Sequence, residues 1–422
     1  MKRLHSYWLL ALSLTGLLLS YGCVDKCEES YEYVEYTPQF MDISSVRTSF
    51  DVLPPQEISR SGKIYLYEDM LFVTEPDSGV HVIDNSDPRT PIKKNFIRLA
   101  GVHDITVKGT IMYADSYMDL VVLDISDPQN ITQITRIENV FANQYYFYDE
   151  TATSFITHYA ETGRVQVNEL DCDRASRFSN GGVIFIDAFD SFALAEMSGA
   201  GSTSGTSGSM ARMNIVGDYL YGIDDWQLNV FDLSTPEAPS EVNEVNVGWG
   251  IETLFPYEDN LFIGAADGMY IFDNTNPLEP AFLSKFNHAR ACDPVVVQND
   301  IAYVTLRDGT ECDGFANQLD IVDVSDLTSP RLLHSFEMDN PHGLGIDGDA
   351  LFICEGDFGL KLFDKAELSK IGSHLKNWIQ NVHAYDVIPL GGHLILIGED
   401  GLYQFDYTDP ENIELLSVIL TK

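Results

Sequence analysis

Positively charged side chains are scarce in this sequence. Its 422 residues include 25 Lys and Arg against 65 Asp and Glu, which gives a formal net charge of −40. Such a chain repels phosphate backbones and anionic lipid headgroups. The composition therefore argues against nucleic acid and against direct binding to a membrane surface, and it leaves cations and cationic partners open.

Compact catalytic motifs are also missing. The chain has no G-x-S-x-G nucleophile elbow, no H-E-x-x-H zinc motif and no phosphate-binding loop. Its 6 cysteines permit disulfides, but 45% hydrophobic residues over this length can build a large core without them. The sequence thus favours a large globular protein and gives no local signature of an enzyme.

The N-terminus carries a processing signal. Two basic residues precede an apolar stretch at 8–19, which is too short for a transmembrane helix and leads into SYGC. Cys23 in this setting resembles the lipidated cysteine of bacterial lipoproteins. We therefore expect a signal peptide at 1–22, lipidation of Cys23 and a lipid-anchored tether at 23–47. An ordinary signal peptide with an unrelated cysteine is the alternative.

The segment VDKCEES, directly after Cys23, bears on the location of the protein. It resembles the export tag that sends lipoproteins of the Bacteroidetes to the outer face of the outer membrane, although Cys27 interrupts the tag. We expect a surface-exposed outer-membrane lipoprotein that contacts the membrane through its lipid anchor only. A periplasm-facing orientation is the alternative.

An internal repeat dominates the rest of the chain. An alternating apolar run that ends in Asp recurs as VHVIDNSDP, LVVLDISDP, LNVFDLSTP, MYIFDNTNP, LDIVDVSDL, LKLFDKAEL and LYQFDYTDP. The anchors are Asp84, Asp124, Asp232, Asp273, Asp323, Asp364 and Asp406. They lie 40 to 50 residues apart, except for one step of 108 residues. RVQVNELDC, which starts at Arg164 and puts Asn168 in the anchor position, fills this gap as a degenerate eighth copy.

Each repeat contains four short strands with alternating polarity, which is the signature of a β-propeller blade. The repeats predict an all-β protein with one propeller at 48–422, built of eight four-stranded blades. Seven blades are the alternative, if the degenerate copy does not fold as a blade. A closed ring leaves no unprotected sheet edge. A flexible Gly/Ser-rich insertion is expected near 198–209, because its small residues cannot bury enough surface to order themselves.

The repeats LVVLDISDP and LDIVDVSD resemble the LVIVD repeat of bacterial and archaeal cell-surface proteins. The segments GSMARMNIVGDYLYGIDD, GWGIETLFPYEDNLFIGAADGMYIFD and NPHGLGIDGDALFICEGDFGLKLFD are further similar to LVIVD-repeat lipoproteins of the Bacteroidetes. This resemblance implies a β-propeller and a location at the cell surface. It implies no activity, since that group has none assigned.

Turn chemistry explains the Asp of the repeat. Its carboxylate can accept backbone N–H groups of the D-x-S/T turn that follows. We therefore assign this motif a structural role.

The first residue of each innermost strand is a better candidate for function. These positions are Lys63, Asp104, Gln144, Arg212, Glu252, Asp293, Gly343 and Asp386. The innermost strands of a propeller line its central channel, so we expect these residues, with His342, to form a ring at the channel mouth. Either their charges neutralise one another at a wet entrance, or they bind a cation or polar ligand. Glu252 and Asp293 are the candidates for a metal, with Ca²⁺ as the candidate ion.

The longest turn, residues 307–318, belongs on the same face. Because the second strand returns antiparallel to the first, the start of this turn must lie near residue 292. We therefore predict a Cys292–Cys312 disulfide that holds the turn beside Asp293. Two free thiols are the alternative.

Three functions follow. We favour a binding module that recognises an extracellular or periplasmic protein, a glycan or a cation at the channel mouth. The alternative is a glycan-active hydrolase or lyase, and a structural role in the cell envelope is the third. Candidate acids and bases for catalysis are His103, Asp104, Glu252, Asp293, His342, His383, Tyr385 and Asp386.

Overall fold

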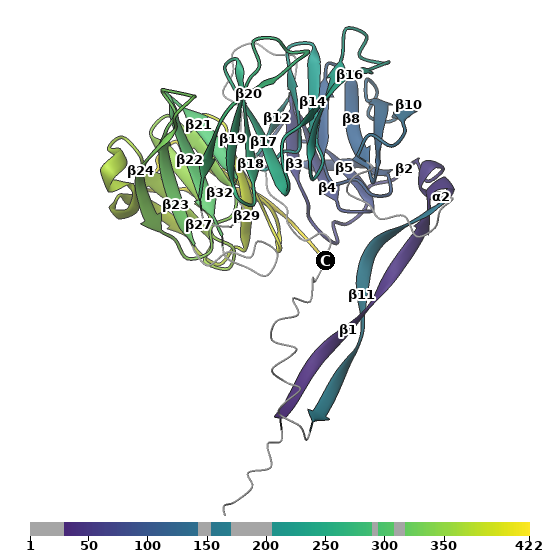
Figure 1. The fold of residues 1–422 in the computed structure, drawn as a ribbon, viewed down its shortest axis with the longest axis horizontal. Coiled ribbons are helices and arrows are strands. Elements are labelled where there is room, and N and C mark those ends of the chain that lie inside the picture. The colour runs from purple at the N-terminus through teal and green to yellow at the C-terminus, as the bar shows by residue number, and fades with distance from the viewer. Residues whose placement is uncertain (1–28, 142–152, 170–204, 289–293, 308–316) are drawn as a thin grey trace, which may run out of the picture. The chain divides into compact units, whose positions relative to one another are not determined.

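A computed structural model of the chain describes residues 29–141, 153–169, 205–288, 294–307 and 317–422 (Figure 1). Two compact units divide these residues. The smaller unit contains residues 29–39 and 157–169, and the larger unit contains the remaining described residues. The Gly/Ser-rich insertion predicted near 198–209 is therefore described only from residue 205 onward.

Seven sheets with a core of four consecutive antiparallel strands form the larger unit. Blade 1 is β3 (Ile64–Tyr67), β4 (Met70–Glu75), β5 (Gly79–Asp84) and β6 (Ile92–Arg98), and blade 2 is β7 (Ile105–Lys108), β8 (Ile111–Ser116), β9 (Asp119–Asp124) and β10 (Thr132–Ile137). Blade 3 is β13 (Met213–Val216), β14 (Tyr219–Ile223), β15 (Gln227–Asp232) and β16 (Ser240–Asn246), and blade 4 is β17 (Ile251–Tyr257), β18 (Asn260–Ala265), β19 (Gly268–Asp273) and β20 (Ala281–Asn287). Blade 5 is β21 (Val295–Gln298), β22 (Ile301–Leu306), β23 (Gln318–Asp323) and β24 (Arg331–Glu337). Blade 6 is β25 (Leu344–Asp347), β26 (Ala350–Cys354), β27 (Leu360–Asp364) and β28 (Leu375–Ile379), and blade 7 is β29 (Ala384–Pro389), β30 (His393–Gly398), β31 (Gly401–Asp406) and β32 (Glu414–Leu420).

The prediction of eight blades is wrong, and the alternative of seven is confirmed. The degenerate copy that starts at Arg164 lies in β11 (Ser154–Glu169), which pairs with β1 (Glu29–Asp42) in a separate two-stranded sheet. Its alternating polarity correctly indicated a strand. Alternation does not specify which strand will be the neighbour, and β1, from the expected tether, provides the pairing.

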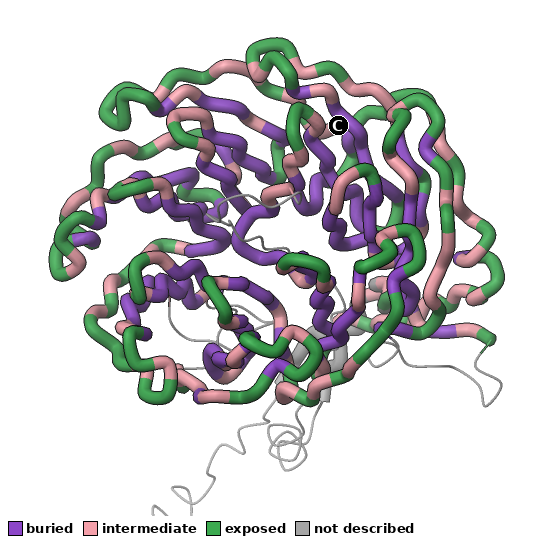
Figure 2. Tube along the Cα trace, turned by 90° about the horizontal axis from the view of Figure 1, so that it is seen from above, coloured by how far each residue is buried: buried purple, intermediate pink, exposed green. Residues whose placement is uncertain are grey.

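The blades close into a ring. Along the chain, each innermost strand contacts the innermost strand of the next blade, from β3 to β29. Blades 7 and 1 share a hydrophobic core that includes Ile64, Ile388 and Ile395. The side-chain amides of Asn85 and Gln404 exchange two hydrogen bonds of 3.0 and 2.7 Å across the same junction. Figure 2 shows buried residues concentrated in the inner strands and exposed residues along the outer strands and turns.

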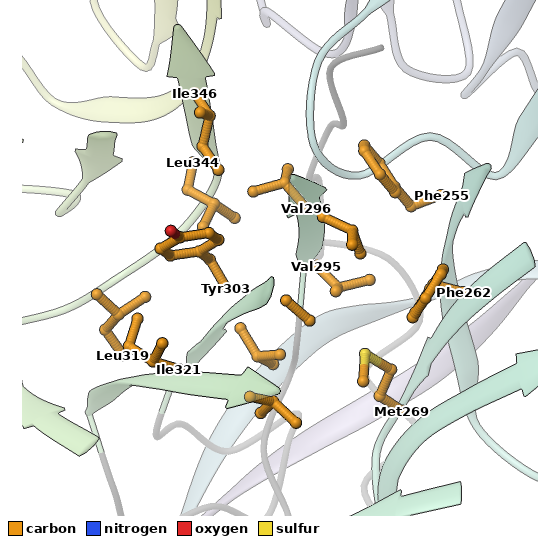
Figure 3. Close-up of a cluster of buried hydrophobic side chains, with 14 of the residues drawn as sticks. Phe255, Phe262, Met269, Val295, Val296, Tyr303, Leu319, Ile321, Leu344 and Ile346 are labelled. Carbon is orange, nitrogen blue, oxygen red and sulfur yellow. The ribbon is translucent and has the colours of Figure 1, made fainter. Parts of the chain in front are cut away.

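Alternating apolar side chains fill the space between blades. In Figure 3, Phe255 and Met269 of blade 4 face Val295 of blade 5, while Tyr303 of blade 5 lies beside Leu344 of blade 6. All five side chains are buried. This packing is the physical reason for the period-two pattern of each repeat, since one face of every strand meets one neighbouring blade.

The expected role of the repeat Asp is confirmed at all seven anchors. Each carboxylate accepts the backbone N–H two residues later, at 2.7 to 3.1 Å. The Ser325 hydroxyl and backbone, together with Arg331, lower the pKa of Asp323 to about 2. The anchor Asp therefore ends the third strand and fixes the turn.

Helix is minor within the described residues. It consists of the short α-helix α2 (Ile43–Arg47) and the 3-10 helix η2 (Leu368–Ser373). In α2, Asp42 caps the first turn, and Arg47 pairs with buried Asp119 of blade 2 at 2.9 Å. Across the described part of the chain, no helix is long and apolar enough to span a membrane.

Candidate functional site

The residues predicted to form a ring do lie at the starts of innermost strands. Lys63, Asp104, Arg212 and Gly343 directly precede β3, β7, β13 and β25, while Glu252 and Asp386 lie near the starts of β17 and β29. His342 precedes Gly343. Gln144 and Asp293 fall outside the described residues.

A segment of the chain contacts the innermost strands of several blades. Residues 205–212, here called the central segment, include β12 (Thr206–Ser207), which pairs with β3 of blade 1. The Ser209 hydroxyl accepts from Leu344 N at 2.8 Å and donates to Asp386 at 3.3 Å. The carbonyl of Ala211 accepts from Leu254 N at 2.8 Å. The central segment thus joins blades 1, 4, 6 and 7 before the chain enters blade 3.

Lys63 and Asp104 tie this segment to blades 1 and 2. Lys63 Nζ lies 3.2 Å from Asp104 Oδ2 and donates to the Met210 carbonyl at 2.8 Å. The same Asp104 oxygen accepts from Arg212 N at 2.6 Å and Met213 N at 2.9 Å. Burial lowers the pKa of Lys63, and Asp104 opposes that shift.

Burial separates these residues from solvent. Lys63, Asp104 and Asp386 are 4%, 2% and 0% exposed. Gly343 has no room for a side chain, because a Cβ there would overlap Asp386 Oδ1 and lie 2.9 Å from Ser209 Oγ. Among these buried members of the ring, Lys63 and Asp104 form an opposite-charge pair, and Asp386 accepts a hydrogen bond from Ser209 of the central segment.

A pocket of about 440 Å³ opens at the edge of the blades where the innermost strands begin. We call it the rim pocket; its described lining is Ser59, Arg60, Ser61, Arg307, Asn340, His342, His383, Tyr385 and Glu399. Most of these residues precede innermost strands, whereas Arg307 and Glu399 follow the second strands β22 and β30. Because first and second strands are antiparallel, all of these positions meet at one edge of their blades.

Three aromatic side chains form one wall of the rim pocket. Tyr385 lies between two histidines, with its ring centroid 5.5 Å from His342 and 4.7 Å from His383. Tyr385 sits at a register shift of β29, a bulge that re-aims a side chain at the edge of a sheet. Nδ1 of His383 lies 2.8 Å from Asp357 and 3.2 Å from Glu399.

His342 is the buried member of this wall. Its burial, together with the nearby positive charges of Arg307 and His383, lowers its pKa to about 2. Its Nε2 lies 3.3 Å from the Asn340 amide. His342 therefore presents a neutral imidazole at neutral pH.

Two arginines contribute positive charge to the rim pocket. Arg60 is 49% exposed and lies 3.2 Å from both the Pro76 carbonyl and the Asp77 carboxylate. Arg307 follows β22 and is partly buried. The pocket therefore combines guanidinium groups, an amide and a phenol, which all donate hydrogen bonds, with the Glu399 carboxylate as an acceptor.

Sequence reasoning singled out His342, His383 and Tyr385 but missed Arg60, Asn340, Arg307 and Glu399. A positional signal was available. Arg60, Asn340 and His383 each lie three residues before a ring position, at Lys63, Gly343 and Asp386. A comparison of the repeats at that position would have identified these side chains.

Metal and disulfide predictions fall largely outside the described residues. Cys23, Cys292, Cys312 and Asp293 are not described, and Cys354 is a buried free thiol. Within the described ranges, no group of three or more His, Cys, Asp or Glu side chains is arranged to hold a metal ion. Glu252 lies on β17 and is half-buried.

The chain is a seven-bladed β-propeller that carries LVIVD repeats. The LVIVD repeat model matches residues 101–138, 207–247 and 290–337. These segments include strands of blades 2, 3 and 5.

Comparison with curated proteins found no match. Among solved structures, the computationally designed protein Ika8 is 11% identical, with a TM-score of 0.49, and 87% of this chain and 89% of that chain are covered. BamB from Moraxella catarrhalis is 9% identical, with a TM-score of 0.47, and 88% of this chain and 97% of that chain are covered. PorZ from Porphyromonas gingivalis is 12% identical, with a TM-score of 0.47, and 88% of this chain and 39% of that chain are covered. Likeness at this level carries no information about a ligand. The β-propeller fold itself suggests an interaction or binding module.

Proposed function

We propose that this protein is a lipid-anchored binding module of the outer membrane that faces the cell exterior and holds a glycan in the rim pocket. The observation that carries the proposal is the convergence of polar side chains from blades 1, 5, 6 and 7 on one pocket. Concave sites with a few convergent polar groups are the usual form of small-ligand sites.

The central segment supports a site at the rim. It occupies the position where the innermost strands converge, and it uses the ring residues Lys63, Asp104 and Asp386 as its partners. A ligand would have to displace these buried contacts to bind at the axis. The rim pocket requires no such rearrangement.

Two sequence features support the proposed location. Lipidation at Cys23 and the acidic tag after it favour the outer face of the outer membrane. The net charge of −40 disfavours other membrane contact, because anionic headgroups repel such a surface.

Glycan binding is tested with an array of bacterial and host polysaccharides and the detergent-solubilised protein. We expect binding to at least one polysaccharide, and we expect His383→Ala to abolish it because His383 forms part of the pocket wall. His334→Ala is the matched control, since His334 lies on the outer strand β24. Absence of binding across the array, or equal effects of the two variants, would reject the proposal.

A glycan-active lyase or hydrolase is the second candidate. The neutral imidazole of His342 and the phenol of Tyr385 face the same pocket, and such a pair can accept and donate a proton. Incubation with each bound polysaccharide separates the two functions. New reducing ends or unsaturated products that are lost in Tyr385→Phe would favour the enzyme.

A further inference from the structure

The composition of the rim pocket differs from that of the whole chain. Acidic side chains outnumber Lys and Arg by 65 to 25 overall, whereas two arginines and one carboxylate are found among the described lining residues. That carboxylate, Glu399, lies 3.2 Å from His383 Nδ1. Arginine therefore outnumbers carboxylate among the described lining residues, and the carboxylates of Asp77 and Asp357 lie beside the pocket, paired with Arg60 and His383.

Arg60 can reach a ligand in the rim pocket. The side chain of Arg60 is half-exposed, and so is that of its ion-pair partner Asp77. Exposed pairs of this kind are weak, so a ligand anion can replace Asp77. Guanidinium groups also match the planar geometry of a carboxylate, which can accept two parallel N–H bonds.

The rest of the wall suits an uncharged, hydroxylated body. Asn340, Tyr385 and the neutral His342 offer hydrogen-bonding groups without a net charge. Phe358, which is 45% exposed, follows Asp357 in a turn, and the Asp357 carboxylate lies 2.8 Å from His383 Nδ1. The Trp378 indole donates to the Phe358 carbonyl at 2.6 Å and fixes this turn.

We infer that the rim pocket recognises an acidic sugar residue of a polysaccharide, with Arg60 and Arg307 on its anionic group and the aromatic wall against its ring. This inference rests on the proposed function and specifies the class of glycan. An aromatic face packs against the C–H face of a sugar ring, while the polar groups bind its hydroxyls.

The experiment uses matched pairs of polysaccharides that differ only in charge: polygalacturonate with its methyl ester, dextran sulfate with dextran, and sialylated with desialylated glycans. We expect at least one acidic member to bind and its neutral counterpart to bind tenfold or more weakly. Arg60→Gln and Arg307→Gln should each weaken binding about tenfold to a hundredfold, as expected for the loss of a charged hydrogen bond.

Arg331→Gln is the matched control. It changes the net charge equally, but Arg331 is exposed on β24 and pairs with Asp323 at the end of a third strand, away from the rim pocket. Its binding should match that of the wild type. This comparison separates a local contact from a change in the overall field of the protein.

The outcomes distinguish this inference from the proposed function. Equal binding of neutral and acidic partners, with silent arginine variants and a strong effect of His383→Ala, would overturn the acidic-sugar inference and retain a glycan site. No binding to any polysaccharide would overturn both. Binding of acidic peptides or phosphatidylglycerol vesicles instead, lost in the same arginine variants, would overturn the sugar assignment.

Discussion

Replacing Asp104 by Ala should destabilise the propeller at its centre. One Asp104 oxygen lies 3.2 Å from Lys63 Nζ and accepts the backbone N–H groups of Arg212 and Met213. The carboxylate therefore joins blades 1 and 2 to the central segment and to the start of blade 3. Its loss removes the counter-charge 3.2 Å from a buried ammonium and the acceptor of three backbone N–H groups, those of Ile105, Arg212 and Met213.

The expected loss in free energy of unfolding is about 3 to 5 kcal/mol, the usual cost of removing one partner of a buried ion pair. The lost N–H bonds overlap with this value, because one carboxylate serves Lys63 and three backbone N–H groups, including that of Ile105, and contributions within a network are not additive. Adding Lys63→Met removes the uncompensated ammonium. The double variant should therefore be more stable than Asp104→Ala alone.

Urea denaturation followed by tryptophan fluorescence measures the change, with midpoints compared at constant slope. Asp218→Ala is the matched control. Asp218 is exposed, and its 2.6 Å pair with Lys108 lies at the surface, where a pair contributes about 0 to 1 kcal/mol. A loss for Asp104→Ala no larger than that of the control would refute the reasoning. Equal stability of the single and double variants would attribute the loss to the N–H bonds alone.

Four other perturbations have defined outcomes. Gly343→Ala should lower the unfolding free energy by about 1 to 3 kcal/mol in urea denaturation, because its Cβ would overlap Asp386. Wild-type protein should partition with membranes while Cys23→Ala stays in the aqueous fraction, and equal partitioning would refute lipidation. Cys312→Ser should lower stability by about 3 kcal/mol under oxidising conditions only, if it pairs with Cys292. The pKa of His342 is about 2 in the folded state and 6.5 in the unfolded chain, so below pH 6.5 the unfolded state binds a proton that the folded state does not. The free energy of unfolding should therefore fall by about 1.4 kcal/mol per pH unit as the pH drops below 6.5. In pH-dependent denaturation, His342→Gln should reduce this slope.

The fold was largely predictable because the residue pattern of each repeat indicates both a strand and the turn that follows it. The alternating run specifies a strand buried against neighbouring blades, and the Asp that follows specifies the turn, as all seven anchors confirm. The predicted number of blades was wrong because the segment that starts at Arg164 was counted as part of a blade. Period-two alternation is the same in a propeller strand and in a two-stranded sheet, so it cannot identify the partner strand.

The central segment shows what composition leaves open. Gly, Ser and Thr were expected to leave 198–209 flexible because they bury little apolar surface. At residues 205–209, small size is instead what allows the chain to fit, since a Cβ on Gly205 would overlap the Tyr65 ring. The order of these residues comes from hydrogen bonds to distant strands, such as that between Ser209 and Leu344. Composition contains no information about such partners.

Two polar positions lie in different surroundings in blades 1 and 7: the first residue of the innermost strand and the residue three positions before it. Lys63, at the start of an innermost strand, donates to the Met210 carbonyl of the central segment and is 4% exposed. Three residues earlier, the chain has not yet entered the strand and lies at the rim, so Arg60 reaches solvent. Asp386 and His383 repeat this contrast in blade 7. The first position therefore contributes to contacts inside the closed ring, whereas the second position places its side chain at the rim pocket.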